Sequence, residues 1–182
     1  MAESTSSILA AWSSFYIMTG SSAAGLTGLM FVVITLVTGV ERLRSAKDGI
    51  GTFSTPTVVH FGSALLASVI LSAPWRSLIH PAALLGFGGL YGVVYVLRGM
   101  YRMKRMAVYR ADLEDWVWYT ILPLLAYGAI LAGAIMLPAI PVNALFAIAG
   151  GVVLLIFVGI RNAWDIVTYI VTEFLQQPPS SS

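Results

Sequence analysis

Five polar side chains near the inner ends of the expected helices could form the walls of a small vestibule. They are His60, Tyr95, Arg98, Arg161 and Asp165. The two guanidinium groups could bind an anionic headgroup, and the cluster as a whole could gate a pore. His60 would make such gating sensitive to pH, because an unperturbed imidazole titrates at about pH 6.5.

The same residues have a second interpretation, as interfacial anchors and contacts between helices. Arg98 would extend along the apolar surface to reach lipid phosphates, and Arg161 and Asp165 are spaced as a local i, i+4 pair. We favour this anchoring interpretation, because basic and aromatic side chains are routine at the inner edge of a membrane.

Catalytic, metal and cofactor chemistry find little support. The chain has no cysteine, which excludes disulfides, thiolate metal sites and covalently attached haem. Its two histidines, His60 and His80, are expected near opposite membrane surfaces, so one iron cannot bind both. The sequence contains no Walker loop, GxSxG or HExxH motif. We therefore predict no catalytic, cofactor-binding or metal-binding residue. An interfacial lipid-handling enzyme, with His60 and Asp165 as its reactive residues, is the function that we favour least.

The elements that position these side chains are membrane helices. Hydrophobic residues make up 58% of the chain and charged residues 10%, whereas soluble domains carry about 25% charged residues. A span takes about 20 apolar residues, and we predict an all-α bundle of five transmembrane helices forming one membrane domain, 1–182. The spans are 22–40, 56–73, 82–98, 116–137 and 144–161. Outside them lie an amphipathic interfacial segment (5–20), an inner helical extension (162–175) and a disordered tail (176–182).

Three local signals set or bend the expected helices. Residues 5–40 as one helix would be about 54 Å long, so we expect a break near 20–22 and an interfacial position for the preceding segment. Thr55 is expected to cap the second span, with Pro56 at its first helical position. Pro123 is expected to kink the fourth span.

The basic residues predict the orientation of the bundle. Segment 41–55 holds three, segment 98–115 holds five, and Arg161 follows the last span, whereas the opposite side has only Arg76. Nine basic residues against one is a strong positive-inside signal. We therefore expect the N-terminus outside and the C-terminus inside a cell (inner or plasma) membrane.

Two stripes of small residues follow helical spacing. On the second span the stripe could line a pore or pack helices, and it comprises Thr57, Ser63, Ala67, Ser68 and Ser72. On the first span it comprises Ser21, Ala24, Gly25 and Gly28. Small residues let membrane helices approach closely, so we expect this second stripe to be a packing seam, within the bundle or against a neighbouring subunit.

The first span also carries an AAxLxGLxFV pattern. Its residues are Ala23, Ala24, Leu26, Gly28, Leu29, Phe31 and Val32. The pattern resembles the opening of uncharacterised bacterial five-helix integral membrane proteins and covers about 20 residues of this chain. Some members of such families are labelled modulators of a membrane-bound protease, which is one example of an accessory role, but the resemblance itself implies no function and supplies no site residue.

These observations leave two main functional hypotheses. No Asp, Glu, Lys or Arg lies in the middle of a span, which disfavours a proton-driven carrier. The first hypothesis is a small channel or passive permease, with its pore inside a homo-oligomer and the second span as lining. The alternative is an accessory or regulatory subunit of another membrane complex. The expected partners are the lipid bilayer and a second copy or another membrane protein, since a net charge of +2 gives no support for nucleic acid.

Overall fold

The computed structural model describes residues 2–38, 47–105 and 116–176, and within them it contains helices and no strand. The helices are α1 (Ala2–Thr38), α2 (Lys47–Ser72), α3 (Ile79–Arg105), α5 (Leu122–Met136) and α6 (Pro141–Gln176), and a π-helical turn, η2 (Val117–Ile121), leads directly into α5. The fold is therefore all-helical, as the composition predicts.

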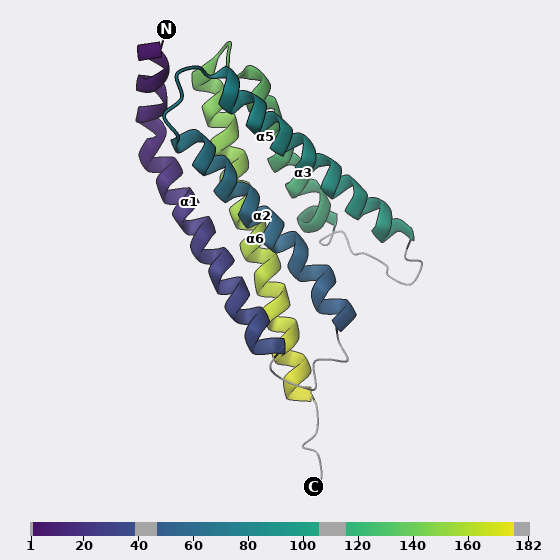
Figure 1. The fold of residues 1–182 in the computed structure, drawn as a ribbon. Coiled ribbons are helices and arrows are strands. Elements are labelled where there is room, and N and C mark those ends of the chain that lie inside the picture. The colour runs from purple at the N-terminus through teal and green to yellow at the C-terminus, as the bar shows by residue number, and fades with distance from the viewer. Residues whose placement is uncertain (1, 39–46, 106–115, 177–182) are drawn as a thin grey trace.

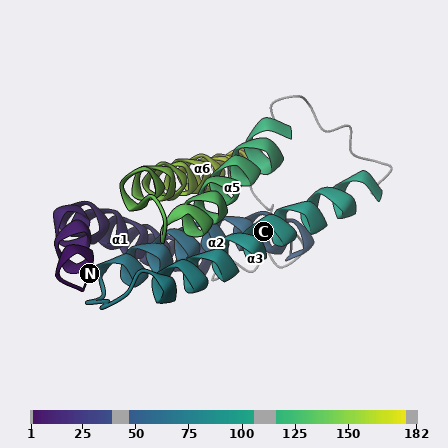
Figure 2. The same ribbon diagram turned by 90° about the horizontal axis from the view of Figure 1, so that it is seen from above.

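The helices form two layers (Figures 1 and 2). The first layer contains α1, α2 and α3 side by side, and the second contains α5 and α6. α6 packs against α5 and α2, α1 packs against α2, and α3 packs mainly against α5. The apolar core lies between the layers, and the start of α1 and the end of α6 lie at opposite ends of the bundle (Figure 1).

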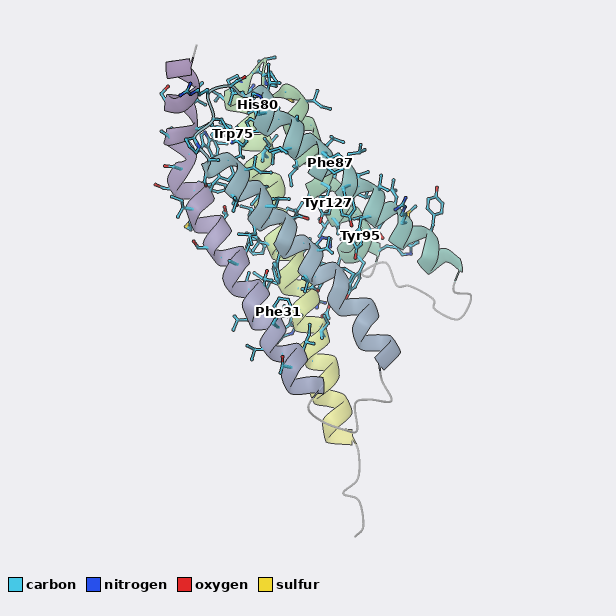
Figure 3. All side chains as sticks on the ribbon, in the orientation of Figure 1. Phe31, Trp75, His80, Phe87, Tyr95 and Tyr127 are labelled. Atoms are coloured by element: carbon cyan, nitrogen blue, oxygen red, sulfur yellow. The ribbon has the colours of Figure 1, made fainter. Side chains whose placement is uncertain are left out.

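Four helices in the described part of the chain are long and apolar enough to cross a membrane. Their candidate spans are Ser7–Thr35, Ile79–Tyr101, Val117–Met136 and Pro141–Thr168, and α2 contributes a shorter apolar stretch, Pro56–Ser72. Large apolar side chains cover the outside of the bundle, and Phe87, labelled in Figure 3, is 77% exposed. Such a surface suits lipid and not water. The chain is therefore a helical membrane protein, and a fifth span through α2 stays a prediction.

The expected break in the first helix is absent, because α1 runs unbroken from Ala2 to Thr38. The hydroxyl groups of Thr19 and Ser22 donate to carbonyl oxygens four residues earlier, and so remain within the helical ladder. Gly20 lies directly against Ser68 of α2, where an added Cβ would be 3.0 Å from the Ser68 Cβ. The small residues here allow α1 to pack closely against α2. The interfacial position of segment 5–20 stays a prediction.

The predicted start of the second helix is wrong. α2 begins at Lys47, and Pro56 lies inside it. A proline removes one backbone donor from the ladder, but the helix can continue on both sides where neighbouring groups compensate, as in many membrane helices. The stretch Pro56–Ser72 of α2 is apolar. Residues 39–46 of the expected polar loop lie outside the described residues.

Pro123 distorts its helix in a specific way. The preceding turn, Val117–Ile121, is a π-helix, and the N–H of Leu122 donates to the carbonyl oxygen of Val117 five residues earlier. Proline lacks an N–H and crowds the turn before it, which explains why the wider turn lies there. The turn before Pro123 is thus a π turn, and the predicted kink stays a prediction.

The last helix is longer than its predicted span, since α6 continues through Gln176. The basic and acidic segment 106–115 and the tail 177–182 lie outside the described residues.

Arg76 lies in the connection between α2 and α3, at the same end of the bundle as the start of α1 (Figure 1). The orientation relative to a membrane stays a prediction.

Glycines allow α5 and α6 to approach closely. A Cβ added at Gly151 of α6 would lie 2.6 Å from the Ala126 carbonyl oxygen, and one at Gly133 of α5 would lie 2.8 Å from the Ala144 carbonyl oxygen. Real Cβ atoms do not come this near to a backbone oxygen. Both glycines are therefore required for this helix pair.

Gly151→Ala should destabilise the bundle, because the added methyl group meets backbone atoms that cannot move aside. We expect a loss of about 1–3 kcal/mol in the free energy of unfolding, measured by denaturant titration in mixed micelles. Gly150→Ala is the matched control, since a Cβ there meets nothing within 4 Å. It should be neutral or stabilising by up to about 1 kcal/mol through helix propensity. Equal stability of the two variants would contradict the close approach of α5 and α6.

Candidate functional site

A buried polar cluster in the middle of the bundle joins α2 to α5. The Tyr127 hydroxyl lies 3.0 Å from Nδ1 of His60 and 3.1 Å from the hydroxyl of Ser63. Tyr127 is 1% exposed and His60 is 2% exposed. His60 and Ser63 are three residues apart and so share one face of α2. The Tyr127 hydroxyl thus serves as hydrogen-bond partner to two side chains of α2.

Glycine 92 makes room for this cluster. A Cβ added at Gly92 of α3 would lie 2.0 Å from the Tyr127 ring. The ring therefore lies flat against the backbone of α3 while its hydroxyl reaches α2. Tyr127 lies among α2, α3 and α5 in Figure 3, and so connects three helices at one point.

A second group of buried polar contacts lies nearer the N-terminal end of the bundle. The hydroxyls of Thr19 in α1 and Ser68 in α2 are 3.1 Å apart, and Ser68 is the donor when Thr19 donates to the Phe15 carbonyl oxygen. The Tyr16 hydroxyl donates to the carbonyl oxygen of Leu145 in α6 at 3.2 Å. These contacts join α1 to both of its neighbours.

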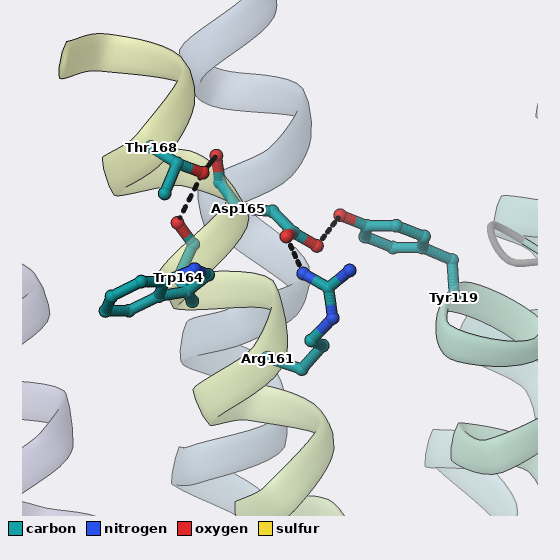
Figure 4. Close-up of polar contacts among 5 residues, drawn as sticks. All are labelled: Tyr119, Arg161, Trp164, Asp165 and Thr168. Carbon is teal, nitrogen blue, oxygen red and sulfur yellow. Dashed lines mark hydrogen bonds and ion pairs between the residues drawn. The ribbon is translucent and has the colours of Figure 1, made fainter. Parts of the chain in front are cut away.

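A third group lies toward the other end of α6 (Figure 4). Arg161 and Asp165 form an ion pair with both side chains about one-third exposed. The Tyr119 hydroxyl of η2 donates to Asp165 Oδ2 over a long distance of 3.5 Å, and the Arg161 guanidinium lies 5.8 Å from the centre of the Trp118 ring. Exposed ion pairs add little to the stability of a fold. This group therefore places a positive and a negative charge at one end of the bundle and contributes less to holding the helices together.

Two buried polar side chains lack a hydrogen-bond partner in the described part of the chain. Asn162 is 1% exposed and neither its amide oxygen nor its amide nitrogen is bonded, and Thr120 is 3% exposed with an unbonded hydroxyl. Buried polar groups are normally paired, and exceptions call for an explanation. Sequence reasoning missed both as site residues. An asparagine inside an apolar helix was the available signal, since its amide cannot be satisfied by lipid.

The predicted vestibule residues do not all have the same surroundings. Arg161 and Asp165 contact each other, as their spacing predicts. His60 instead bonds to Tyr127, Tyr95 stacks on Tyr91 with ring centres 6.4 Å apart, and Arg98 is exposed. A single vestibule formed by all five therefore stays a prediction, and so does an enzymatic role for His60 with Asp165.

The two predicted stripes have different surroundings. On α2, Thr57, Ala67 and Ser68 are buried within the chain, and the Ser72 hydroxyl donates to the Ser68 carbonyl oxygen. On α1 the stripe faces outward, and its four residues, Ser21, Ala24, Gly25 and Gly28, are all exposed. A Cβ added at Gly25 or Gly28 meets nothing within 4 Å. The α1 stripe is therefore not a seam within the described bundle.

Among the described residues, no three His, Cys, Asp or Glu side chains lie close enough together to hold a metal ion. Comparison of the chain with protein-family models, with curated protein sequences and with solved structures finds no match. The function is therefore argued from the arrangement of the side chains alone.

Tyr127→Phe should destabilise the bundle, because it leaves His60 and Ser63 without their shared partner. We expect a loss of about 1 kcal/mol in the free energy of unfolding, the scale of one hydrogen bond between membrane helices. The measurement is unfolding in mixed micelles. Tyr91→Phe is the control, since Tyr91 is 58% exposed, and it should change stability by less than half as much. An unchanged Tyr127→Phe protein would show that the cluster contributes nothing to the packing of α2 against α5.

Proposed function

We propose that the protein is a small channel or passive permease whose path follows a row of polar side chains inside the bundle. The observation that carries the proposal is the set of polar side chains inside the bundle, which we propose to form one row. The buried members are Thr19, Thr57, His60, Ser68, Thr120, Tyr127 and Asn162, and the part-buried ones are Ser63, Tyr119, Arg161 and Asp165.

Buried polar groups are expensive in a membrane protein unless they are paired or functional. Pairing accounts for the first part of the row, where Thr19 bonds to Ser68 and Tyr127 bonds to α2. It does not account for Thr120 and Asn162, which lack partners among the described residues. The unpartnered groups favour a role in contacting a solute over a role in holding helices together.

The path is proposed to lie within one protomer. Thr57, Ala67 and Ser68, on the stripe expected to line a pore, are buried inside the chain. A pore between copies would need this face to be available at the surface. Assembly into a homo-oligomer remains part of the proposal, with each protomer carrying its own path.

The charges near the path favour solutes without net charge. In the described apolar helices the Asp, Glu, Lys and Arg residues are Arg98, which is exposed, and the paired Arg161 and Asp165. Arg161 and Asp165 are opposite in sign and adjacent, so their fields largely cancel beyond a few ångströms. An ion in the row would therefore lose its hydration without a compensating charge.

The proposal predicts faster permeation of neutral solutes into liposomes that contain the protein. Stopped-flow light scattering should show several-fold higher permeability to urea or glycerol than in empty liposomes, with no increase for KCl. Asn162→Leu should remove most of that increase, because it replaces a buried amide on the path. Asn143→Leu is the matched control on the same helix, at an exposed position.

Permeability equal to that of empty liposomes for every solute, in a protein shown to be folded, would contradict the permease. An equal loss of solute permeability in Asn162→Leu and Asn143→Leu would contradict a path along the buried face of α6.

The α1 stripe favours a second candidate, an accessory subunit of another membrane complex. Small residues at i, i+4 spacing commonly form contacts between membrane helices, and here Gly25 and Gly28 face outward with free space above them. The double variant Gly25→Leu, Gly28→Leu should fold normally for the same reason. It should lose any heterologous membrane protein that cross-links to the native chain, whereas Gly99→Leu, at another open position, should keep it. Cross-links unchanged in the double variant would contradict docking at this stripe.

A further inference from the structure

Aromatic side chains gather at two levels of the bundle, and the first level is nearer the start of α1. The rings of Trp12 in α1 and Phe146 in α6 are 4.7 Å apart, and the rings of Trp75 and His80 stack 6.1 Å apart. Trp12 and Trp75 each lie seven residues beyond the hydroxyl contact that joins the antiparallel helices α1 and α2, so the two pairs share one level. We call these four residues the N-terminal belt.

The second level is nearer the end of α6. The Arg161 guanidinium lies 5.8 Å from the centre of the Trp118 ring, which joins α6 to η2. Three residues after Arg161, Trp164 is 66% exposed, and two residues later α6 packs with Met30 of α1 and Phe61 of α2. We call Trp116, Trp118, Tyr119 and Trp164 the C-terminal belt. The five tryptophans of the chain thus all belong to one belt or the other.

The two belts are separated by about the thickness of a membrane. On α6, 18 residues separate Phe146 from Trp164, which is a rise of about 27 Å. On α3, 18 residues separate His80 from the exposed Arg98, again about 27 Å. The hydrocarbon core of a bilayer is about 30 Å thick.

The surface between the belts suits hydrocarbon. Each of the five α-helices exposes a large apolar side chain there, namely Ile17, Leu66, Phe87, Leu125 and Phe157. Between the belts the described helices carry no Asp, Glu, Lys or Arg except Arg161, which is three residues from Trp164. Figure 3 shows Trp75 and His80 at one end of the bundle and Phe87 between the two levels.

We infer that the two belts lie at the two surfaces of a phospholipid bilayer, with its hydrocarbon between them. Indole and phenol rings favour this region because each has an apolar body and a polar group. The first span then runs from Trp12 to about Met30 and not over 22–40. α2 crosses as well, since Phe61 packs at one level and Trp75 belongs to the other. This placement is independent of solute permeation.

The test measures the depth of two positions on α1 for which the alternative spans disagree. The belts place Ser21 near the middle of the bilayer, about 14 Å from Trp12, and Phe31 at the opposite surface. A span over 22–40 would place Phe31 in the middle and Ser21 at the edge. Both side chains are exposed, and the chain has no cysteine, so Ser21→Cys and Phe31→Cys can each carry a single spin label.

The measurement is electron paramagnetic resonance on the full-length protein in phosphatidylcholine liposomes. Oxygen concentrates in the hydrocarbon and a nickel chelate stays in water, so the ratio of their collision rates with the label gives its depth. The exposed positions Phe157→Cys and Val142→Cys are the deep and shallow references on α6. We expect the Ser21 label to be at least as deep as the Phe157 label, and the Phe31 label to be nearly as shallow as the Val142 label.

A label at Leu66, an exposed position of α2, should also be deep. A Phe31 label deeper than the Ser21 label would overturn the belts and restore the span over 22–40. A Leu66 label as shallow as the Val142 label would overturn the crossing of α2. A Ser21 label that neither oxygen nor the chelate reaches would show that protein covers this face, and would overturn its assignment to lipid.

Discussion

The hydroxyl of Tyr127 is the contact on which the arrangement of the helices most depends. It bonds to His60 and Ser63 of α2 while the ring that carries it presses on the backbone of α3 at Gly92. Apolar surface does little to bring helices together in lipid, so close packing and hydrogen bonds have to select the neighbours. One tyrosine does both here, which ties the two layers together near the middle of the bundle.

The same constraint explains why α2 carries so many polar groups. It contacts α1, α3 and α6 directly, and it reaches α5 through Tyr127. A helix surrounded in this way exposes less of itself to lipid, so several hydroxyl groups can be accommodated. Its polar stripe is satisfied mainly by other helices of the same chain.

Local features of the fold could be predicted from the sequence, and contacts between distant helices could not. The Arg161–Asp165 pair follows from spacing on one helix, and the presence of several long apolar helices follows from composition. The partner of His60 is 67 residues away, and helical periodicity defines a face without defining what it meets. The small residues near Gly20 resemble a helix boundary in the sequence, because their packing against Ser68 depends on a neighbouring helix that sequence alone does not locate. Pro56 resembles a helix start, yet α2 continues on both sides of it.

The distribution of charge also bears on how the proposed path could be driven. Coupling to the membrane potential requires charge that moves within the field, and coupling to protons usually requires acidic or basic side chains inside the membrane. In the described apolar helices the Asp, Glu, Lys and Arg residues are Arg98, which is exposed and so lies off the proposed path, and the paired Arg161 and Asp165. The Arg161–Asp165 pair itself carries no net charge. A neutral solute moving along neutral groups gains nothing from either gradient, so net transport would follow the solute's own concentration difference. The same polar row that favours a path therefore favours a passive one.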